Sequence, residues 1–284
     1  MFNPTAELAS SFATHLSETF LDYFSGRQPE YAAFIGGCAR MVLERLGNSD
    51  ALYHNAEHTI MVTLVGQQIL RGRLVTESVQ AEDWLHYVVA LLLHDIGYLR
   101  DIVDGDQENL VVINDQGDTV KPPRGASDAF LAPYHVERGM MYVRQRFRGT
   151  DLIDEERIAA AIDYTRFPVP EDPHYQCTAS EPALLRSADL IGQMADPFYH
   201  RKIGALYQEF SETGMNEELG YESAVDLMEQ FPDFFWSRVQ PLIGPALGHL
   251  EQTMEGKQWV AQLYNHIFQV DHRTSMLGPF TGRA

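Results

Sequence analysis

The sequence predicts an all-α fold, and three observations support this prediction. Apolar residues recur at helical spacing along most of the 284 residues, as Leu8, Phe12, Leu16 and Phe20 illustrate. Glycine, proline and short polar residues stand where these periodic segments would begin or end. No segment shows a convincing alternation of apolar and polar residues, which would be typical of a half-buried strand.

The first third of the chain is predicted to form four helices, at about residues 6–23, 30–46, 55–70 and 76–96. Gly47, Gly72 and Gly97 are the expected stop signals of the second, third and fourth helix. Asn55 is the expected N-cap of the third helix, because an asparagine side chain can accept hydrogen bonds from the free backbone N–H groups of the first turn.

Residues 101–134 are rich in turn residues and lack helical periodicity, so we expect a long loop. A loop of this length is often a lid or a binding loop, and a disordered insertion is the alternative. Asp151 and Ser180 are the expected N-caps of two later helices. The further helices are expected at about residues 135–148, 151–164 and 180–194, with three or four more between 197 and 270.

The composition indicates a globular protein with an acidic surface. The formal net charge is −19, from 40 acidic and 21 basic residues. Such a surface repels nucleic-acid duplexes and anionic membranes, so neither is an expected partner. A small anionic substrate is still compatible, because a bound divalent metal would invert the local potential.

The chain shows no segment for export or for crossing a membrane. Its N-terminus lacks the basic start and apolar core of a signal peptide. The longest apolar run, residues 87–93, is far short of the roughly 18 residues that a bilayer requires. Cys38 and Cys177 are expected to be free thiols rather than a disulfide. These features predict a cytoplasmic protein.

The first motif with chemistry is the segment from Tyr53 to His58. His54 and His58 are four residues apart, so they share one face if both are helical. Two histidines on one face are a common arrangement of metal ligands. The alternative is a pair of solvated histidines at a helix start.

Two further motifs place carboxylates in apolar helices. His94 and Asp95 end a strongly apolar segment, and Asp189 lies inside another. Burial of these groups is costly unless they are paired or bound to a metal. The alternatives are a local hydrogen bond for Asp95 and a salt bridge with Arg186 for Asp189. Imidazoles combined with carboxylates favour a divalent transition metal (Mn, Fe, Zn, Co or Ni) over an all-oxygen calcium site.

The order of His58, His94, Asp95 and Asp189 resembles the HD-domain metal-dependent phosphohydrolase superfamily. The resemblance implies an HD-domain-like helical bundle with additional C-terminal helices. It covers about residues 50–195, the expected metal-binding core. No linker cleanly divides the sequence, so a single helical domain over residues 1–284 is expected, with a helical elaboration at about 197–270. The resemblance also implies that these four residues bind a first metal and that Asp95 can bridge to a second one.

The segment from His54 to His58 is similar to the His-Asn-x-x-His segment of cyclic nucleotide phosphodiesterases, in which the first histidine protonates the leaving oxygen. This likeness assigns a catalytic role to His54. His135 resembles the histidine that binds a second metal in binuclear members. Those members carry one more histidine where this chain has Tyr164 and Thr165, and Asp163 is the available substitute. One metal or two is therefore left open.

The function that the resemblance implies is hydrolysis of a small phosphate ester, such as a nucleotide or a cyclic nucleotide, by metal-activated water. His54 and Asp95 would be catalytic, and Lys121 and Arg124 are the first candidates for binding the substrate, since they lie in the long loop. The alternatives are an HD-type di-iron oxygenase and a non-catalytic HD signalling or binding module. The substrate, the metal and the formation of a homodimer are left open.

Overall fold

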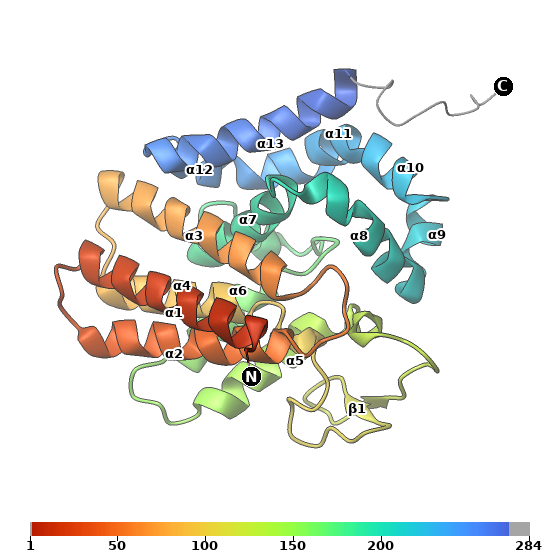
Figure 1. Ribbon diagram of the computed structural model, residues 1–284, viewed down its shortest axis with the longest axis horizontal. Helices are drawn as coiled ribbons and strands as arrows, with labels where there is room; N and C mark the ends of the chain where they lie inside the picture. The colour runs from red at the N-terminus through yellow and green to blue at the C-terminus, as the bar shows by residue number, and fades with distance from the viewer. Residues whose placement is uncertain (1, 273–284) are drawn as a thin grey trace.

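The computed structural model describes residues 2–272, and its architecture is all-α, as the sequence predicts (Figure 1). Two-residue strands β1 (Val111–Val112) and β2 (Thr119–Val120) pair in antiparallel register. The α-helices are α1 (Pro4–Tyr23), α2 (Pro29–Leu46), α3 (Ala56–Thr76), α4 (Ala81–Leu93), α5 (His135–Phe147), α6 (Glu155–Asp163), α7 (Glu181–Met194), α8 (Tyr199–Thr213), α9 (Met215–Leu219), α10 (Ala224–Glu229), α11 (Phe231–Phe234), α12 (Gln240–Leu250) and α13 (Met254–His272). Shorter helical turns are η1 (Ile96–Tyr98), η2 (Asp128–Leu131), η3 (Pro173–Gln176) and the π-helical η4 (Phe235–Val239).

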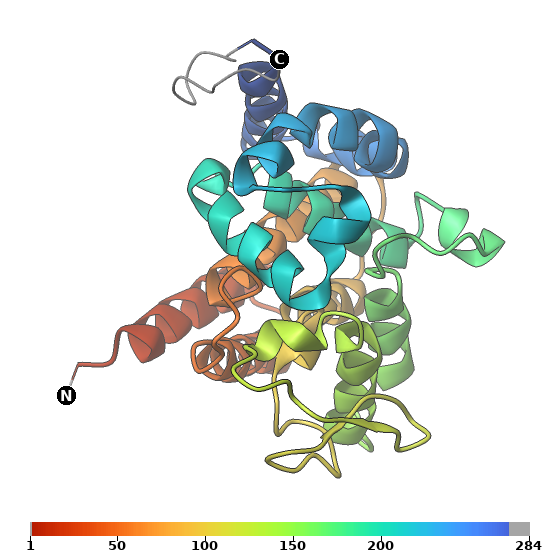
Figure 2. The same cartoon turned by 90° about the vertical axis from the view of Figure 1, so that its right-hand side faces the viewer.

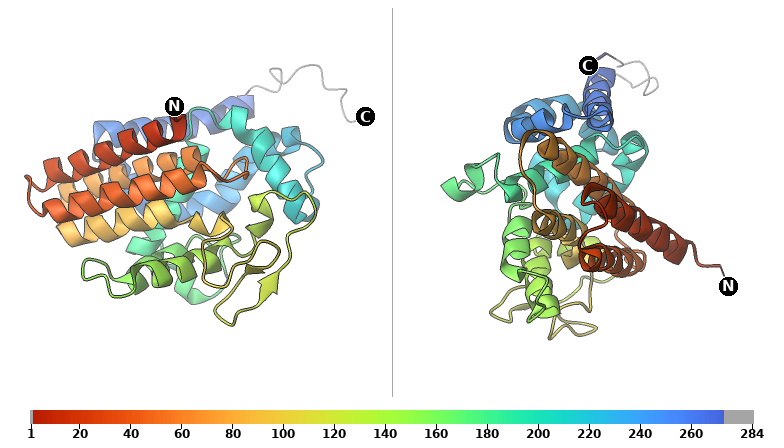
Figure 3. Two further views of the ribbon diagram at one scale, coloured as in Figure 1. Left: turned by 60° about the horizontal axis from the view of Figure 1, so that its bottom comes forward. Right: turned by 90° about the vertical axis from the view of Figure 1, so that its left-hand side faces the viewer.

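The long helices α1 to α4 run side by side along the molecule (Figure 3). α3 packs against α4, α7 and α12, and α4 packs against α2 and α6 as well. Every residue of α4 except Glu82 and Asp83 is buried. The apolar surface of α4 is therefore covered within the chain and is not free to pair with a second copy.

The C-terminal helices complete the same core. α12 and α13 lie over α3 and α7 in Figure 1, while α8 to α11 form the face that Figure 2 turns toward the viewer. One cluster of buried apolar residues extends from Ala9 in α1 to Ile267 in α13. The predicted domain range of 1–284 extends beyond the described residues. Among residues 2–272, no helix combines the length and the apolar content that would be required to cross a membrane.

Gly72 does not end the third helix, because α3 continues to Thr76. A Cβ atom at Gly72 would overlap the backbone carbonyl of His249 in α12. The glycine therefore permits the close crossing of α3 and α12, and the sequence pattern was misread as a stop signal.

The fourth helix is shorter than predicted. α4 begins at Ala81 and ends at Leu93, and the turn η1 follows it. At Gly97, inside η1, a Cβ atom would overlap the carbonyl oxygen of His135, the first residue of α5. This contact brings the His94-Asp95 motif next to His135.

Two predicted N-caps are confirmed and one is wrong. The Asn55 side chain accepts a hydrogen bond from the backbone N–H of Glu57 at 2.9 Å, and that of Ser180 accepts one in the first turn of α7. Asp151 is not a cap, because α6 begins at Glu155 and Asp154 caps it. The backbone N–H of Asp154 donates to His86 Nε2 at 2.8 Å, which fixes the start of the helix four residues beyond the expected one.

The segment 101–134 folds into turns, the β1–β2 hairpin and η2. Strands of two residues are too short to show the alternation that predicts a strand. The start of the segment is fastened to α5 by Arg138 and Asp106, which we call the Arg138 cluster. The Arg138 guanidinium donates to both carboxylate oxygens of Asp106 at 3.0 Å, and both side chains are buried.

The prediction of three or four helices between residues 197 and 270 is too low, since α8 to α13 lie there. α9, α10 and α11 have 5, 6 and 4 residues, so none of them spans enough turns to produce a periodic pattern. The two cysteines are free, with Cys38 buried and Cys177 exposed, as expected.

Candidate metal centre

Three helices bring together the four residues that the resemblance assigns to a first metal, which we call the metal cluster. His58 lies in the first turn of α3, His94 and Asp95 follow the end of α4, and Asp189 lies in α7. His58 Nε2 is 3.3 Å from Asp95 Oδ2 and 3.3 Å from Asp189 Oδ1. His94 Nε2 is 3.1 Å from Asp95 Oδ2 and 3.7 Å from Asp189 Oδ1.

These atoms lie at ion-pair distance but not in hydrogen-bond geometry. The Nε2 atoms of His58 and His94 and the Oδ2 atom of Asp95 are buried and have no hydrogen-bond partner. A buried polar atom without a partner costs free energy, and a buried charge costs more. One ligand atom each from His58, His94 and Asp189 lies within 4.8 Å of the others. Converging imidazole nitrogens and carboxylate oxygens are the donor set of a divalent transition metal, so the cluster could hold such an ion.

Backbone carbonyls orient two of the imidazoles. His94 Nδ1 donates to the carbonyl oxygen of Leu91 at 2.8 Å, and His135 Nδ1 donates to that of Ala132 at 2.6 Å. Because a carbonyl can only accept, these contacts place the proton on Nδ1 and leave the Nε2 lone pair available to a metal. Metal-binding histidines in proteins are commonly fixed in this way.

The electrostatics of the metal cluster favour a positive charge among its ligands. Burial alone would lower the pKa values of His58 and His94, but the carboxylates of Asp95 and Asp189 outweigh it and raise both pKa values to about 9. Burial opposes ionisation of Asp95, yet the two imidazoles hold its pKa well below the usual range. A bound cation would take the place of the protons that otherwise balance the carboxylates.

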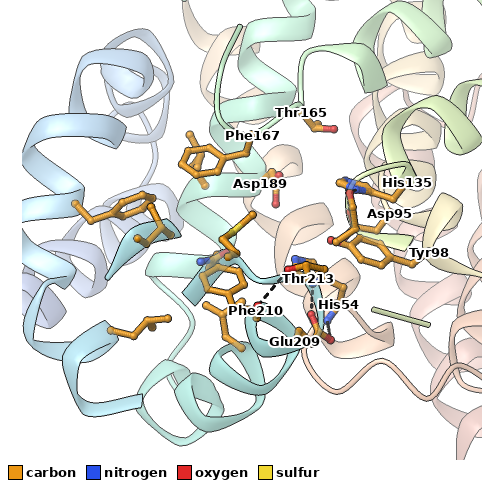
Figure 4. A pocket seen from close by; sticks show the side chains of 18 of the residues that line it. His54, Asp95, Tyr98, His135, Thr165, Phe167, Asp189, Glu209, Phe210 and Thr213 are labelled. Carbon is orange, nitrogen blue, oxygen red and sulfur yellow. Dashed lines mark hydrogen bonds and ion pairs between the residues drawn. The ribbon is translucent and has the colours of Figure 1, made fainter. Parts of the chain in front are cut away.

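His54 lies beside the metal cluster and is held by Glu209 of α8. His54 Nδ1 is 2.5 Å from Glu209 Oε2, and Glu209 Oε1 accepts from the backbone N–H groups of Tyr53 and His54 at 2.6 and 3.2 Å (Figure 4). Burial would lower the pKa of His54, but the Glu209 carboxylate more than compensates and raises it. His54, His58 and Asp95 form a second group whose ligand atoms lie within 4.8 Å.

Tyr98 is inserted between two of the histidines. Its ring stacks on His54 with centroids 4.6 Å apart and on His135 with centroids 4.4 Å apart. Neither Tyr98 nor Glu209 was singled out from the sequence. Tyr98 follows the His94-Asp95 motif by three residues, which was an available signal. Glu209 is 155 residues from His54 in the chain, so no local pattern connects them.

A second metal position is only partly built. His135 Nε2 is 3.8 Å from Asp95 Oδ1. Thr165 lines the same cavity, but its hydroxyl donates to the carbonyl of Ile162 at 2.7 Å. The carboxylate of Asp163 accepts from Arg166 and from Tyr175, each at 2.6 Å, so it is engaged away from the metal cluster.

Three basic residues considered in the sequence lie away from the metal cluster. Lys121 and Arg124 are exposed on the long loop and do not line the cavity over the metal cluster. Arg186 donates to the backbone carbonyls of Tyr175 and Cys177 instead of pairing with Asp189. The salt-bridge alternative for Asp189 is therefore not what the structure shows.

A cavity of about 150 Å³ lies over the metal cluster. Figure 4 shows Phe167 and Phe210 on the side of this cavity opposite His135, Asp95 and Tyr98. The side next to the metal cluster is therefore polar, whereas the facing side carries aromatic rings.

Comparison with protein families matches residues 2–273 to the Npun_R2479-like family. No curated protein and no solved structure matches the chain. The family description names no activity, so the resemblance to the HD-domain superfamily stays a prediction. Because the match covers nearly the whole sequence, the chain belongs to the Npun_R2479-like family.

Proposed function

We propose that this protein is a metal-dependent hydrolase of the HD-domain type that cleaves a small phosphate ester. One observation carries the proposal. Buried atoms of His58, His94 and Asp95 without hydrogen-bond partners converge next to a cavity that a small molecule can enter. The cost of burying these atoms is explained if they bind a cation that acts on a molecule in the cavity.

His58, His94, Asp95 and Asp189 would hold the ion, and their nitrogen and oxygen donors suit Mn, Fe, Zn, Co or Ni. A divalent ion held there would lower the pKa of a bound water, which supplies a nucleophile near neutral pH. The backbone contact of His94 with Leu91 keeps its imidazole in the binding orientation. Asp189 lines the cavity and, at 22% exposed, is the most exposed of the four proposed ligands.

In this proposal His54 protonates the leaving oxygen of the substrate. Its position supports this role, because it lines the cavity and groups with His58 and Asp95. Glu209 fixes the ring through Nδ1 and stabilises its protonated form, while stacking on Tyr98 limits its rotation.

The partial second position does not provide comparable support for the di-iron oxygenase. That chemistry requires two well-held irons, and only His135 and the shared Asp95 are available beside it, since Thr165 and Asp163 are engaged elsewhere. We therefore propose one metal as the minimum for activity.

The test is hydrolysis of a chromogenic phosphomonoester and a chromogenic phosphodiester, with added manganese, by the wild type and by Asp95→Ala. We expect metal-dependent activity that Asp95→Ala abolishes. Asp104→Ala is the matched control, because Asp104 is an exposed acid on the long loop and should leave activity unchanged. Equal activity of Asp95→Ala and the wild type would overturn the metal mechanism.

A further inference from the structure

The cavity over the metal cluster has two unlike walls. The wall that carries His54, Asp95, His135 and Asp189 is polar and can bind a metal. The facing wall comes from α8 to α11 and from the loop after α6. Its apolar side chains include Phe167, Leu206, Phe210, Leu219, Leu227 and Phe231.

Positive charge in this cavity is limited to the metal side. Among the residues that the structure describes, no lysine or arginine lines the cavity. Two further cations, Arg166 and Lys202, are already paired. Arg166 pairs with Glu137 and Asp163, and Lys202 pairs with Asp196. Beyond the metal cluster, His54 and His135, a polyphosphate would therefore have no partner for its charges in this cavity.

The apolar wall offers few partners to a polar substrate. Apart from Glu209, which is bound to His54, the polar residues here are neutral, namely Gln193, Tyr199, Thr213 and Tyr221. The Thr213 hydroxyl is already used, because it donates to the carbonyl of Phe210 at 3.2 Å. A sugar or a nucleobase placed against the leucine and phenylalanine side chains of this wall would lose hydrogen bonds to water and regain few of them.

We propose that the substrate is an ester with one phosphoryl group, which lies at the metal cluster, and a compact apolar organic group, which lies against Leu206, Phe210 and Leu227. This inference rests on the proposed function. The cavity has a volume of about 150 Å³, which sets an upper limit on the size of the apolar group. A dry apolar cavity of about 150 Å³ is known to take up benzene, so the group is close to a six-membered ring.

This inference gives the C-terminal elaboration a role. The helices α8, α10 and α11 build most of the apolar wall, while α3, α4 and α7 supply the metal ligands. α8 contributes to both sides of the cavity. Its Phe210 lies on the apolar side, and the neighbouring Glu209 holds His54 beside the metal cluster. Substrate selection and catalysis therefore meet in adjacent residues of one helix.

The experiment compares cyclohexylmethyl phosphate with glucose 6-phosphate, each as the monoester and as the methyl diester, on the manganese-loaded wild type. The two share a six-membered ring with a primary phosphate and differ chiefly in the sugar hydroxyls and the ring oxygen. We expect kcat/KM to be at least about 100-fold higher for the cyclohexyl ester, because a single added hydroxyl is disfavoured by about that factor in an apolar pocket.

A variant in the apolar wall should reduce this preference. Leu227 is 6% exposed and lines the cavity, and Leu227→Asn should lower kcat/KM for the cyclohexyl ester about 10-fold while changing the glucose ester little. Leu8→Asn is the matched control, because Leu8 is 47% exposed at the far N-terminal helix and should leave the ratio unchanged. If Leu227→Asn does not fold, the substrate comparison on the wild type still decides the inference.

A binding measurement separates this inference from the proposed function. Uncharged cyclohexylmethanol, titrated into the protein by calorimetry, should bind to the wild type and more weakly to Leu227→Asn. Hydrolysis of both esters at equal kcat/KM would overturn the apolar substrate and leave the hydrolase standing. Binding of cyclohexylmethanol without hydrolysis of any ester would support the apolar pocket and overturn the phosphohydrolase, and the absence of both would overturn both.

Discussion

The metal cluster and the Arg138 cluster are both buried and charged, yet they differ in their hydrogen bonds. The polar atoms of the Arg138 cluster have hydrogen-bond partners, whereas several of those in the metal cluster do not. The Arg138 guanidinium has five N–H donors, and they donate to Asp106 and to the carbonyls of Gly97, Leu99 and Val112. Asp106 also accepts from three backbone N–H groups, those of residues 102, 103 and 112. In the metal cluster, by contrast, two imidazole nitrogens and a carboxylate oxygen have no hydrogen-bond partner.

The two clusters are attached to the same elements. His94 and Asp95 of the metal cluster lie in the segment after α4, and Arg138 donates to the carbonyl of Gly97 in the same segment. The difference is therefore not one of environment. A buried charged group whose hydrogen bonds are all made fixes the backbone around it, whereas converging atoms without hydrogen-bond partners could hold a ligand. The two clusters should respond differently to metal removal, mutation and pH.

The largest effect should come from removing the metal. A chelator should reduce hydrolysis at least about 10⁴-fold, because the pKa of water is about 15.7 when free and about 7 when bound to a suitable metal. The helical content should persist, since the apolar core and the Arg138 cluster do not depend on a cation. The measurements are hydrolysis rate and circular dichroism before chelation, after it and after manganese is restored. Loss of helicity on chelation would show that the two clusters are one folding unit.

The next effect is on stability. Arg138→Met should lower the free energy of unfolding by about 3–5 kcal/mol, because it leaves the buried carboxylate of Asp106 without its partner. Arg144→Met is the matched control in the same helix. Arg144 is 33% exposed and pairs with the exposed Glu156, so its loss should cost about 1 kcal/mol or less. Urea unfolding measures the free energy of unfolding of both variants. Equal losses would contradict the proposal that the Arg138 cluster stabilises the fold more than an exposed ion pair does.

A smaller effect on activity is expected for Glu209, which lies just outside the metal cluster. Glu209→Gln should lower kcat about 10- to 100-fold, because outer partners of a metal site have effects of that size. Metal content should be unchanged, since Glu209 contacts His54 and not the four ligands. Metal analysis and steady-state rates give the two readouts, and Glu218→Gln, an exposed acid in α9, serves as the control. Loss of the metal in Glu209→Gln would place Glu209 in the metal cluster itself.

The fold class was predictable because long amphipathic helices carry their own periodicity. The N-caps Asn55 and Ser180 were also predictable, since a capping side chain acts on its own first turn. The prediction that Gly72 ends a helix was wrong because the sequence does not distinguish a glycine at a helix end from one at a helix crossing. The residue at the crossing, His249, is remote in the chain. The short helices α9 to α11 were missed because they depend on tertiary packing.

The candidate site likewise contains residues that could be predicted from the sequence and residues that could not. His94, Asp95 and Asp189 could be selected from the sequence because each stands in an apolar segment where an unpaired polar group is costly, and His58 because it is four residues from His54. Their convergence in space agrees with that selection. Glu209 and the apolar wall could not be found, because both come from helices that meet the site only after folding. Lys121 and Arg124 were chosen for being in the long loop, and the loop carries them to an exposed surface.

The smallest expected effect concerns the pH dependence of stability. Burial would raise the pKa of Asp106, but the guanidinium of Arg138 outweighs it, so its pKa is lowered from the usual value of 3.8. A carboxyl group whose pKa is lower in the folded state stabilises the protein above its unfolded pKa, and this contribution is lost as pH falls through the folded pKa. One such proton gives a slope of at most about 1.4 kcal/mol per pH unit.

The free energy of unfolding of the wild type should therefore fall more steeply below about pH 4 than that of Asp106→Asn, whose side chain cannot bind this proton. Urea unfolding of both proteins between about pH 2.5 and 5 measures the difference in slope. Metal-free protein is used for both, so that competition between protons and metal at His58 and His94 contributes equally and cancels in the comparison. Parallel curves would mean that Asp106 keeps an ordinary pKa in the folded state. The Arg138 cluster would then hold the loop through its backbone hydrogen bonds rather than through its ion pair.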